Sequence, residues 1–377
     1  MHLQLSSKPR IAYISSVLAK TFCFVMSLCL KPMRLMYWSE ISGCGFVVLE
    51  ITSYFCSNSS HHASRRTANQ GGTFAFYTPM RYSKQPLDFT DILKLLKSRG
   101  LIIRDESKAI ECLKVISYFR LDNYFHPMES DKILHTFKSN SYFENAVSLY
   151  AFDCKLRVLI FSAIQSAEIA LRSKMIHHFS LCYGAFWFTD YTCFRNRDIF
   201  DKCLSQIKQE LSRTREDFII EHQNKYSDPV FPPVWKTLEV TSFGTLSKLF
   251  CNFSDNHVKK RIAREFNLPQ HLVLESWIKS AVVLRNCLAH HSRIWNRKFP
   301  VRPQVNVALR GNWIKPLVGN ADKLYPQLCY LQYMLNVINP QNIFSVRLKD
   351  LLAEYTNVDT LAMGFPKDWQ NEPLWRP

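Results

Sequence analysis

Residues 285–297 hold side chains suited to chemistry on a phosphodiester. Arginine can bind phosphate oxygens through two parallel hydrogen bonds, and histidine can transfer protons near neutral pH. Within thirteen residues this stretch contains three arginines, two histidines and two amides, namely Arg285, Asn286, His290, His291, Arg293, Asn296 and Arg297. We interpret it as the active centre of a helical domain that cuts RNA.

Arg285 and His290 form the candidate catalytic pair, spaced R-x4-H with Asn286 beside the arginine. We expect His290 to act as general base or acid at a ribose 2′-hydroxyl. Arg285 would stabilise charge on the phosphorane-like transition state, and Asn286 would orient the histidine or the phosphate. Because attack by the 2′-hydroxyl needs no metal, we expect a metal-independent reaction. A polar network between packed helices is the structural alternative for so short a pattern.

Six further side chains are candidates for contact with the RNA backbone. Four of them belong to the same stretch: His291, Arg293, Asn296 and Arg297. Arg157 and Arg172 are the other two, and each follows an acid by four residues, Asp153 and Glu168 respectively, in the order that favours i,i+4 pairing. We expect these pairs either to lie on a solvated helix face or to offer their arginines to phosphates.

The apolar run after Pro269 predicts a helix that leads into residues 285–297. On a continuous helix, four residues would lie on one face at spacings of four, three and four: Asn286, His290, Arg293 and Arg297. Arg285 would lie about 140° from His290 at roughly 100° per residue. The two can therefore converge within one chain only if the helix distorts or ends between them. Otherwise two copies would share the site, and both readings indicate a homodimer.

The composition favours a basic helical protein that meets an anionic partner. Apolar residues make up 47% of the 377 residues, which is ample for a core, and only ten residues are glycine. So few glycines argue against a β-rich or Rossmann-type protein. The formal net charge of +17 predicts nucleic acid as partner more readily than a membrane surface. A protein that merely has basic faces is the alternative.

The twelve cysteines do not indicate a metal site. None of them belongs to a C-x-x-C pair or to a zinc-ligand cluster with histidines. Most lie singly in apolar helical patterns, where cysteine behaves as a small buried hydrophobe. We therefore expect reduced thiols in a cytoplasmic protein, with neither metal nor other cofactor.

The sequence divides into four segments that differ in their hydrophobic periodicity. Residues 1–79 show no sustained period; their apolar stretch 11–30 is interrupted by Lys20 and serines. We expect an extension upstream of the fold, with a membrane anchor or a genuine, poorly structured extension as alternatives. The other segments are a small helical region (80–142), a helical nuclease domain (143–300) and a C-terminal helical extension with a tail (301–377). The tail, 358–377, is expected either to be loose or to pack on the body.

Several helices are predicted from apolar periodicity and capping residues. The longest covers 143–179, with an apolar face that includes Val158 and Ile169. A helix capped by Asp88 or Thr90 ends before Gly100, and Ser107 caps the next. The remaining predicted helices cover 196–226, 234–250, 258–266 after an Asp255 cap, 321–338 and 341–355.

Aromatic residues gather around Arg120. Tyr118 and Phe119 precede it, and Tyr124 and Phe125 follow. Aromatic rings interleaved with arginine can stack on RNA bases. They can equally form the core of a small helical hairpin, and we favour the core.

Six blocks in one order resemble the Abi abortive-infection family (AbiD/AbiF type). The likeness covers about residues 82–300. The blocks are 84–87, 99–101, 116–121, 150–157 with Glu168 and Leu171-Arg172 behind it, 233–235 with 243–247, and 285–297.

The resemblance implies an all-α, HEPN-like helical bundle with ribonuclease activity. Domains of the type it resembles contain an R-x4-6-H motif, and Arg285 with His290 fits this spacing. Only one convincing copy is present here, whereas such nucleases generally build the site from two domains, so a homodimer is implied. Similar proteins are thought to act as growth-arresting toxins during phage infection, some of them held in check by a non-coding RNA. A non-catalytic RNA-binding regulator of a defence or toxin–antitoxin system is the alternative.

Overall fold

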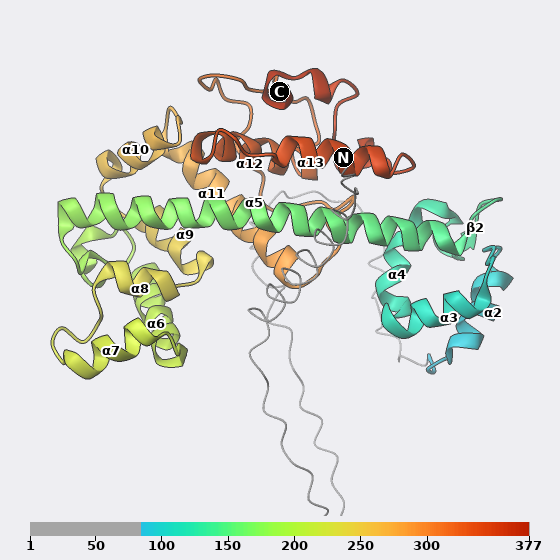
Figure 1. The fold of residues 1–377 in the computed structure, drawn as a ribbon, viewed down its shortest axis with the longest axis horizontal. Coiled ribbons are helices and arrows are strands. Elements are labelled where there is room, and N and C mark those ends of the chain that lie inside the picture. The colour runs from blue at the N-terminus through green and yellow to red at the C-terminus, as the bar shows by residue number, and fades with distance from the viewer. Residues whose placement is uncertain (1–83, 377) are drawn as a thin grey trace, which may run out of the picture. The chain divides into compact units, whose positions relative to one another are not determined.

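The computed structural model describes residues 84–376 (Figure 1). The predictions for residues 1–79, including the apolar stretch 11–30, lie outside this range. The described part is mostly α-helical, as predicted, with one small two-stranded sheet. Its twelve α-helices are α2 (Phe89–Ser98), α3 (Glu106–Val115), α4 (Tyr118–Phe125), α5 (Phe143–Tyr183), α6 (Arg197–Arg213), α7 (Asp217–Lys225), α8 (Val234–Val240), α9 (Phe243–Asn252), α10 (Asn256–Glu265), α11 (His271–Ala289), α12 (Leu324–Ile338) and α13 (Phe344–Glu354).

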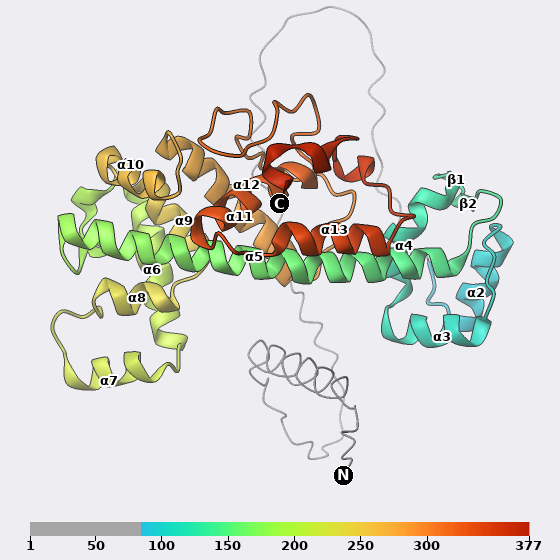
Figure 2. The ribbon, with the colours of Figure 1, turned by 45° about the horizontal axis from the view of Figure 1, so that its top comes forward.

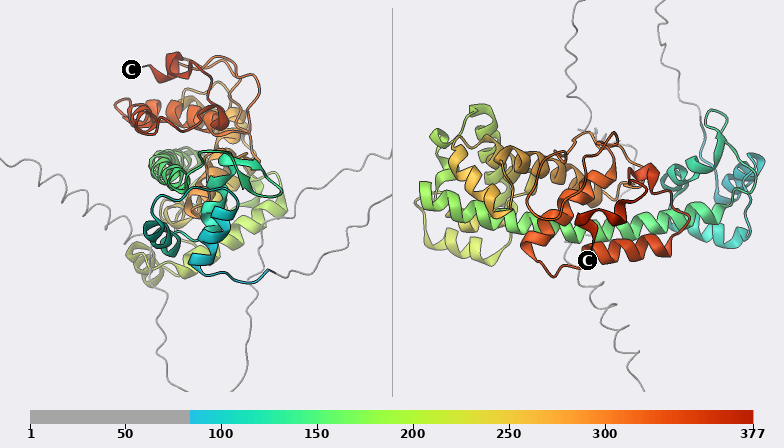
Figure 3. Two further views of the ribbon diagram at one scale, coloured as in Figure 1. Left: turned by 90° about the vertical axis from the view of Figure 1, so that its right-hand side faces the viewer. Right: turned by 90° about the horizontal axis from the view of Figure 1, so that it is seen from above.

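Helix α5 is the element on which most of the other helices pack, namely α4, α8, α9, α10, α11, α12 and α13. It is 41 residues long, contains neither glycine nor proline, and ends at Gly184, whose φ of 78° suits a residue without Cβ. Helices α12 and α13 form a layer along one side of α5 (Figures 2 and 3). The expected apolar face of this helix is wrong in part, because Val158 and Ile169 are 65% and 58% exposed.

The first three helices have a small hydrophobic cluster of their own, to which the first turn of α5 contributes. Asp88 caps α2 as predicted, accepting a hydrogen bond from the Asp91 backbone N–H at 2.8 Å. The predicted cap of α3 is wrong. Asp105, not Ser107, accepts the hydrogen bond from the Lys108 N–H, so Ser107 lies inside the helix.

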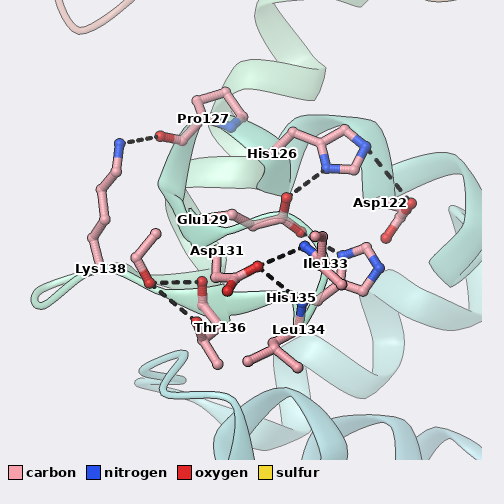
Figure 4. A network of polar contacts seen from close by, with 11 residues as sticks. Asp122, His126, Pro127, Glu129, Asp131, Ile133, Leu134, His135, Thr136 and Lys138 are labelled. Carbon is pink, nitrogen blue, oxygen red and sulfur yellow. Dashed lines mark hydrogen bonds and ion pairs between the residues drawn. The ribbon is translucent and has the colours of Figure 1, made fainter.

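A hairpin of strands β1 (Glu129–Asp131) and β2 (Thr136–Phe137) follows α4 and was not predicted. Its buried Glu129 carboxylate contacts the Nδ1 atoms of His126 and His135, each at 2.9 Å (Figure 4). Asp131 accepts hydrogen bonds from two backbone N–H groups of the turn. Because polar contacts rather than apolar alternation stabilise this short hairpin, the strand pattern is missing from the sequence.

Two of the predicted helices are each divided in the structure. The helix expected over 196–226 is α6 and α7, separated where Thr214 adopts an extended backbone. The helix expected over 234–250 is α8 and α9, separated at Thr241 and Ser242, both of them extended. Ser242 then caps α9 by accepting a hydrogen bond from the Thr245 N–H. Capping by Ser242 therefore begins a new helix where the apolar period alone would have continued the first one.

The C-terminal segment packs on the body of the protein. Of the two alternatives predicted for residues 358–377, packing is therefore confirmed and a loose tail is wrong. Trp369 and Trp375 are buried, and the Trp375 Nε1–H donates to the Tyr325 hydroxyl on α12 at 3.1 Å. The ring of Phe365 packs against Tyr325 and Trp369.

Among residues 84–376, no helix combines the length and the apolar character needed to cross a membrane.

Candidate active site at the C-terminal end of helix α11

Helix α11 ends inside the candidate motif. Ala289 is its last residue, and His290 is the C-cap. The His291 N–H donates to Leu288 O at 3.0 Å, and the Ser292 N–H donates to Cys287 O at 2.8 Å. This pair of hydrogen bonds defines a Schellman motif. The helix therefore ends at His290, and the predicted continuous helix face through Arg293 and Arg297 is wrong. Between Arg285 and His290 the helix is regular, since the His290 N–H donates to Asn286 O at 3.0 Å, so the helix end does not bring these two side chains onto one face.

His291 occupies the position of this motif that usually holds glycine. Its φ is 53°, in the left-handed region that is unfavourable for a side chain with Cβ. Arg120 of α4 donates from Nη1 to the His291 carbonyl oxygen at 2.8 Å. A charged donor on this carbonyl stabilises the left-handed turn, so α4 helps to hold the residues that follow α11.

A buried carboxylate on α5 holds the next part of the loop. The Asp153 side chain is fully buried, and its Oδ1 accepts hydrogen bonds from the backbone N–H groups of Ile294 at 3.2 Å and Trp295 at 2.7 Å. Its Oδ2 accepts hydrogen bonds from the Tyr124 hydroxyl at 2.7 Å and from Arg157. Burial raises the pKa of this carboxyl, against the opposing influence of Arg157 and the donated hydrogen bonds. The loop is therefore fixed to the central helix.

The three candidate catalytic residues lie around the end of α11. His290 is exposed, whereas Arg285 and Asn286 are partly exposed on the last turns of the helix. The Arg285 Nη1 group donates to Asn286 Oδ1 at 3.4 Å, a long hydrogen bond. Asn286 therefore contacts Arg285 in the structure, whereas the sequence led us to expect that it orients the histidine or the phosphate.

The four neighbouring candidates for RNA contact differ in solvent exposure and in the hydrogen bonds they already make. His291 is exposed. Arg293 is half-buried, and burial lowers the pKa of its guanidinium, although arginine stays charged at neutral pH. The Asn296 Oδ1 accepts a hydrogen bond from Lys323 Nζ at 2.8 Å. Arg297 donates to the Arg293 carbonyl oxygen at 3.4 Å. His291 is therefore the most accessible of the four.

The structure places Arg157 and Arg172 inside the protein. Their side chains are 10% and 9% exposed. Arg157 is paired with Asp153, while Arg172 is paired with Glu168 at 2.8 Å and donates to the Thr241 carbonyl oxygen at 3.0 Å. The prediction that both pairs lie on a solvated helix face is therefore wrong. Since each guanidinium already has buried partners, we do not retain either arginine as a phosphate contact.

Sequence reasoning missed the residues that support the site from other helices. Arg120, Tyr124 and Asp153 contact the motif loop or the carboxylate that holds it. Arg120 and Asp153 lie in two of the six family-like blocks, and the terminal block is the loop itself. Blocks distant in sequence that share a family resemblance were the available signal, because such blocks can meet in space.

The comparison with protein families agrees with these blocks. Residues 111–296, which include α4, α5 and α11 with its loop, match the family model described as Abi-like protein. This region of the chain belongs to the Abi-like family, which confirms the predicted family. Membership supports a role in abortive infection, a form of phage defence. No curated protein and no solved structure matches the chain.

Proposed function

We propose that this protein is a HEPN-type endoribonuclease that acts as a homodimer in abortive infection. The observation that carries the proposal is the construction at the end of α11. An exposed histidine, His290, follows a partly exposed arginine, Arg285, by little more than one helical turn. Arg120 and Asp153 hold the next residues through their backbone. Side chains that are accessible while their backbone is fixed are what a preorganised site requires.

The reaction we propose is cleavage of RNA by its own 2′-hydroxyl. The 2′-oxygen attacks the adjacent phosphorus and loses its proton, and the bond from phosphorus to the 5′-oxygen breaks. The products are a 2′,3′-cyclic phosphate and a 5′-hydroxyl. His290 of one copy would accept the proton as general base or donate one to the leaving 5′-oxygen as general acid.

Arg285 would bind the nonbridging phosphate oxygens, whose negative charge increases in the transition state. Asn286, which accepts from Arg285 in the structure, would orient that guanidinium. The backbone contacts would come from His291, Arg293, Asn296 and Arg297, supported by the net charge of +17. A homodimer would supply two motifs to one site, since the chain has one convincing copy.

The physiological role we propose is growth arrest in the cytoplasm of an infected cell. An enzyme that cuts cellular RNA must be restrained between infections. A non-coding RNA bound to the same basic surface would restrain it, because phosphate contacts there would exclude substrate.

Growth arrest and RNA cleavage test this proposal when the full chain is expressed beside its variants. We expect His290→Ala and Arg285→Ala each to reduce cleavage by at least about a hundredfold, the scale of a lost general acid–base or oxyanion contact. His177→Ala and Arg215→Ala are matched controls, because both residues are exposed and lie outside the site. Full cleavage by the first two variants would contradict the assignment.

A second experiment separates the nuclease from a non-catalytic RNA-binding regulator. Purified wild-type protein is incubated with cellular RNA, with and without EDTA, and binding and cleavage are both measured. We expect cleavage that EDTA does not abolish. RNA binding without cleavage would favour the regulator, and loss of cleavage with EDTA would overturn the metal-independent mechanism.

A further inference from the structure

The motif loop, which follows α11, is held at a third place by residues at the beginning of α12. The Lys323 Nζ donates to Asn296 Oδ1 at 2.8 Å, and the Phe299 N–H donates to the Asp322 carbonyl oxygen at 2.7 Å. Lys323 is the N-cap residue of α12, and the first twelve residues of that helix are all buried. The two hydrogen bonds therefore join the end of the loop to a well-packed part of the protein.

The contact with Lys323 differs from the other two because it holds a side chain. Arg120 and Asp153 bond to the backbone of the loop. An ammonium group can only donate hydrogen bonds, so its partner atom in Asn296 must be the amide oxygen. The orientation of the Asn296 amide is thus determined by its partner, and the Nδ2 group is left for another acceptor.

The Asn296 Nδ2 group is available to donate. Among residues 84–376 it has no hydrogen-bond partner, and it is not buried. The backbone φ of Asn296 is 47°, in the left-handed region that asparagine tolerates better than most residues. Asparagine therefore combines tolerance of the turn, an acceptor for Lys323 and an unused donor. Glycine would suit the backbone and aspartate would serve Lys323, but neither would supply the donor.

The stem of Lys323 packs against the backbone of the C-terminal segment at Gly364. A Cβ atom at Gly364, where φ is 88°, would lie 2.6 Å from the Lys323 Cβ, so only glycine allows this close approach. Packing of the stem reduces the entropy that is lost when the ammonium is held at Asn296. Both residues lie beyond residue 296, where the match with the Abi-like family ends.

We propose that Lys323 is a positioning residue of the candidate active site, which orients the Asn296 amide so that its N–H group binds a phosphate of the RNA. An amide donor and a phosphate oxygen form a charge-assisted hydrogen bond. Phosphate contacts fix the register of a nucleic acid on a protein. The inference rests on the proposed function in that RNA is the partner, and it makes the C-terminal extension a part of the RNA-binding site.

Binding of a single-stranded RNA whose 2′-hydroxyls are methylated tests the inference, because this RNA cannot be cut through that hydroxyl. In the full chain, Asn296→Ala and Lys323→Met are each expected to raise the dissociation constant about tenfold, the scale of one lost hydrogen bond to a charged group. The double variant should bind no more weakly than either single variant, because the lysine acts through the amide. Additive losses would show that Lys323 acts independently of Asn296 and would overturn the inference.

Asn296→Asp separates this role from a purely structural one. Aspartate has nearly the same size and accepts a stronger hydrogen bond from Lys323, so the midpoint of urea unfolding should not fall. RNA binding should nevertheless weaken at least about tenfold, because a negative oxygen replaces the donor to phosphate. An Asn296→Asp protein that binds RNA as tightly as the wild type would overturn the inference.

Two further lysine variants serve as controls. Lys323→Arg keeps a charged donor and should bind RNA nearly as tightly as the wild type. Lys367→Met removes the same charge from an exposed position of the C-terminal extension, and it should also bind normally. Equal losses in Lys323→Met and Lys367→Met would indicate a general effect of net charge and would contradict the assignment.

Cleavage of unmodified RNA by the same samples keeps the two proposals apart. A wild type that binds RNA through Lys323 and Asn296 but does not cut it contradicts the proposed nuclease and leaves this inference standing. Cleavage with a normal KM in both Lys323→Met and Asn296→Ala contradicts this inference and leaves the nuclease standing. A raised KM with a nearly constant kcat in both variants supports the two together.

Discussion

Helix α5 carries two ion pairs that look alike in sequence and act differently in the structure. Asp153 with Arg157 and Glu168 with Arg172 have the same i,i+4 spacing, and the pairs are about 22 Å apart along the helix. In the first pair the acid reaches out of the helix, to backbone N–H groups of the motif loop. In the second pair the arginine does so, to the carbonyl between α8 and α9.

The difference shows that spacing alone does not reveal what a charged pair supports. Both pairs are buried because other segments cover them, and each extra contact is with residues distant in sequence. The first pair fixes the residues after α11, where the candidate chemistry lies. The second fixes a junction between two short helices, on another part of α5. We therefore expect the first pair to matter for stability and activity, and the second for stability alone.

Loss of the Asp153 carboxylate should have the largest effect. Asp153→Ala leaves Arg157 buried without its partner and removes the acceptor of two backbone N–H groups. Breaking a buried pair in this way costs about 3–5 kcal/mol. Urea unfolding should show this loss, and cleavage of RNA should fall even at temperatures where the variant is folded. A folded Asp153→Ala protein with full activity would contradict the link between this pair and the site.

Replacement of Arg172 is the matched change in the second pair. Arg172→Ala leaves the buried Thr241 carbonyl and the Glu168 carboxylate without their donor, at a cost of about 1–3 kcal/mol. The midpoint of urea unfolding should decrease, while the cleavage rate of the folded protein should stay within about twofold of wild type. A cleavage defect as large as that of Asp153→Ala would remove the distinction between the two pairs.

Arg120 should affect activity more than stability, because its side chain contacts the motif loop from an exposed position. Arg120→Ala removes the hydrogen bond to the His291 carbonyl. We expect cleavage of RNA to fall about tenfold, roughly the effect of 1.4 kcal/mol, with little change in the unfolding midpoint. Arg99→Ala, on the helix C-cap of α2, is the control. Equal activity of the two variants would show that the loop does not need Arg120.

The smallest expected effect concerns the left-handed residue itself. His291→Gly removes the steric cost at φ 53°, which is roughly 1 kcal/mol for a residue with Cβ. Part of this gain is lost to the greater freedom of glycine in the unfolded chain. We therefore expect a slightly higher melting temperature. If the His291 side chain binds RNA, KM should rise while kcat stays nearly constant, and an unchanged KM would exclude that contact.

The sequence predicted those features that depend on neighbouring residues. The caps at Asp88 and Asp255 and the long uninterrupted helix α5 all follow from local pattern. Helix periodicity predicted that Arg285 and His290 lie about 140° apart on a continuous helix, and α11 is continuous from Arg285 to its C-cap at His290. The family resemblance located the ordered blocks, which the family comparison confirms over residues 111–296.

The remaining features depend on contacts between distant residues. Asp153 lies 141 residues before Ile294 in sequence, so neither its burial nor its role could follow from a local pattern. The prediction of which face of α5 is buried was partly wrong for the same reason. Val158 and Ile169 fit an apolar period as well as the residues that are buried, and only the packing of the other helices decides which face is covered.

The chemical nature of the RNA ends is the most direct measure of the central claim. Purified full-length protein is incubated with RNA, and the new termini are identified by mass spectrometry, with His290→Ala in parallel. We predict 2′,3′-cyclic phosphate and 5′-hydroxyl ends from the wild type and none from the variant. Products that end in a 3′-hydroxyl, or equal cleavage by His290→Ala, would contradict the account.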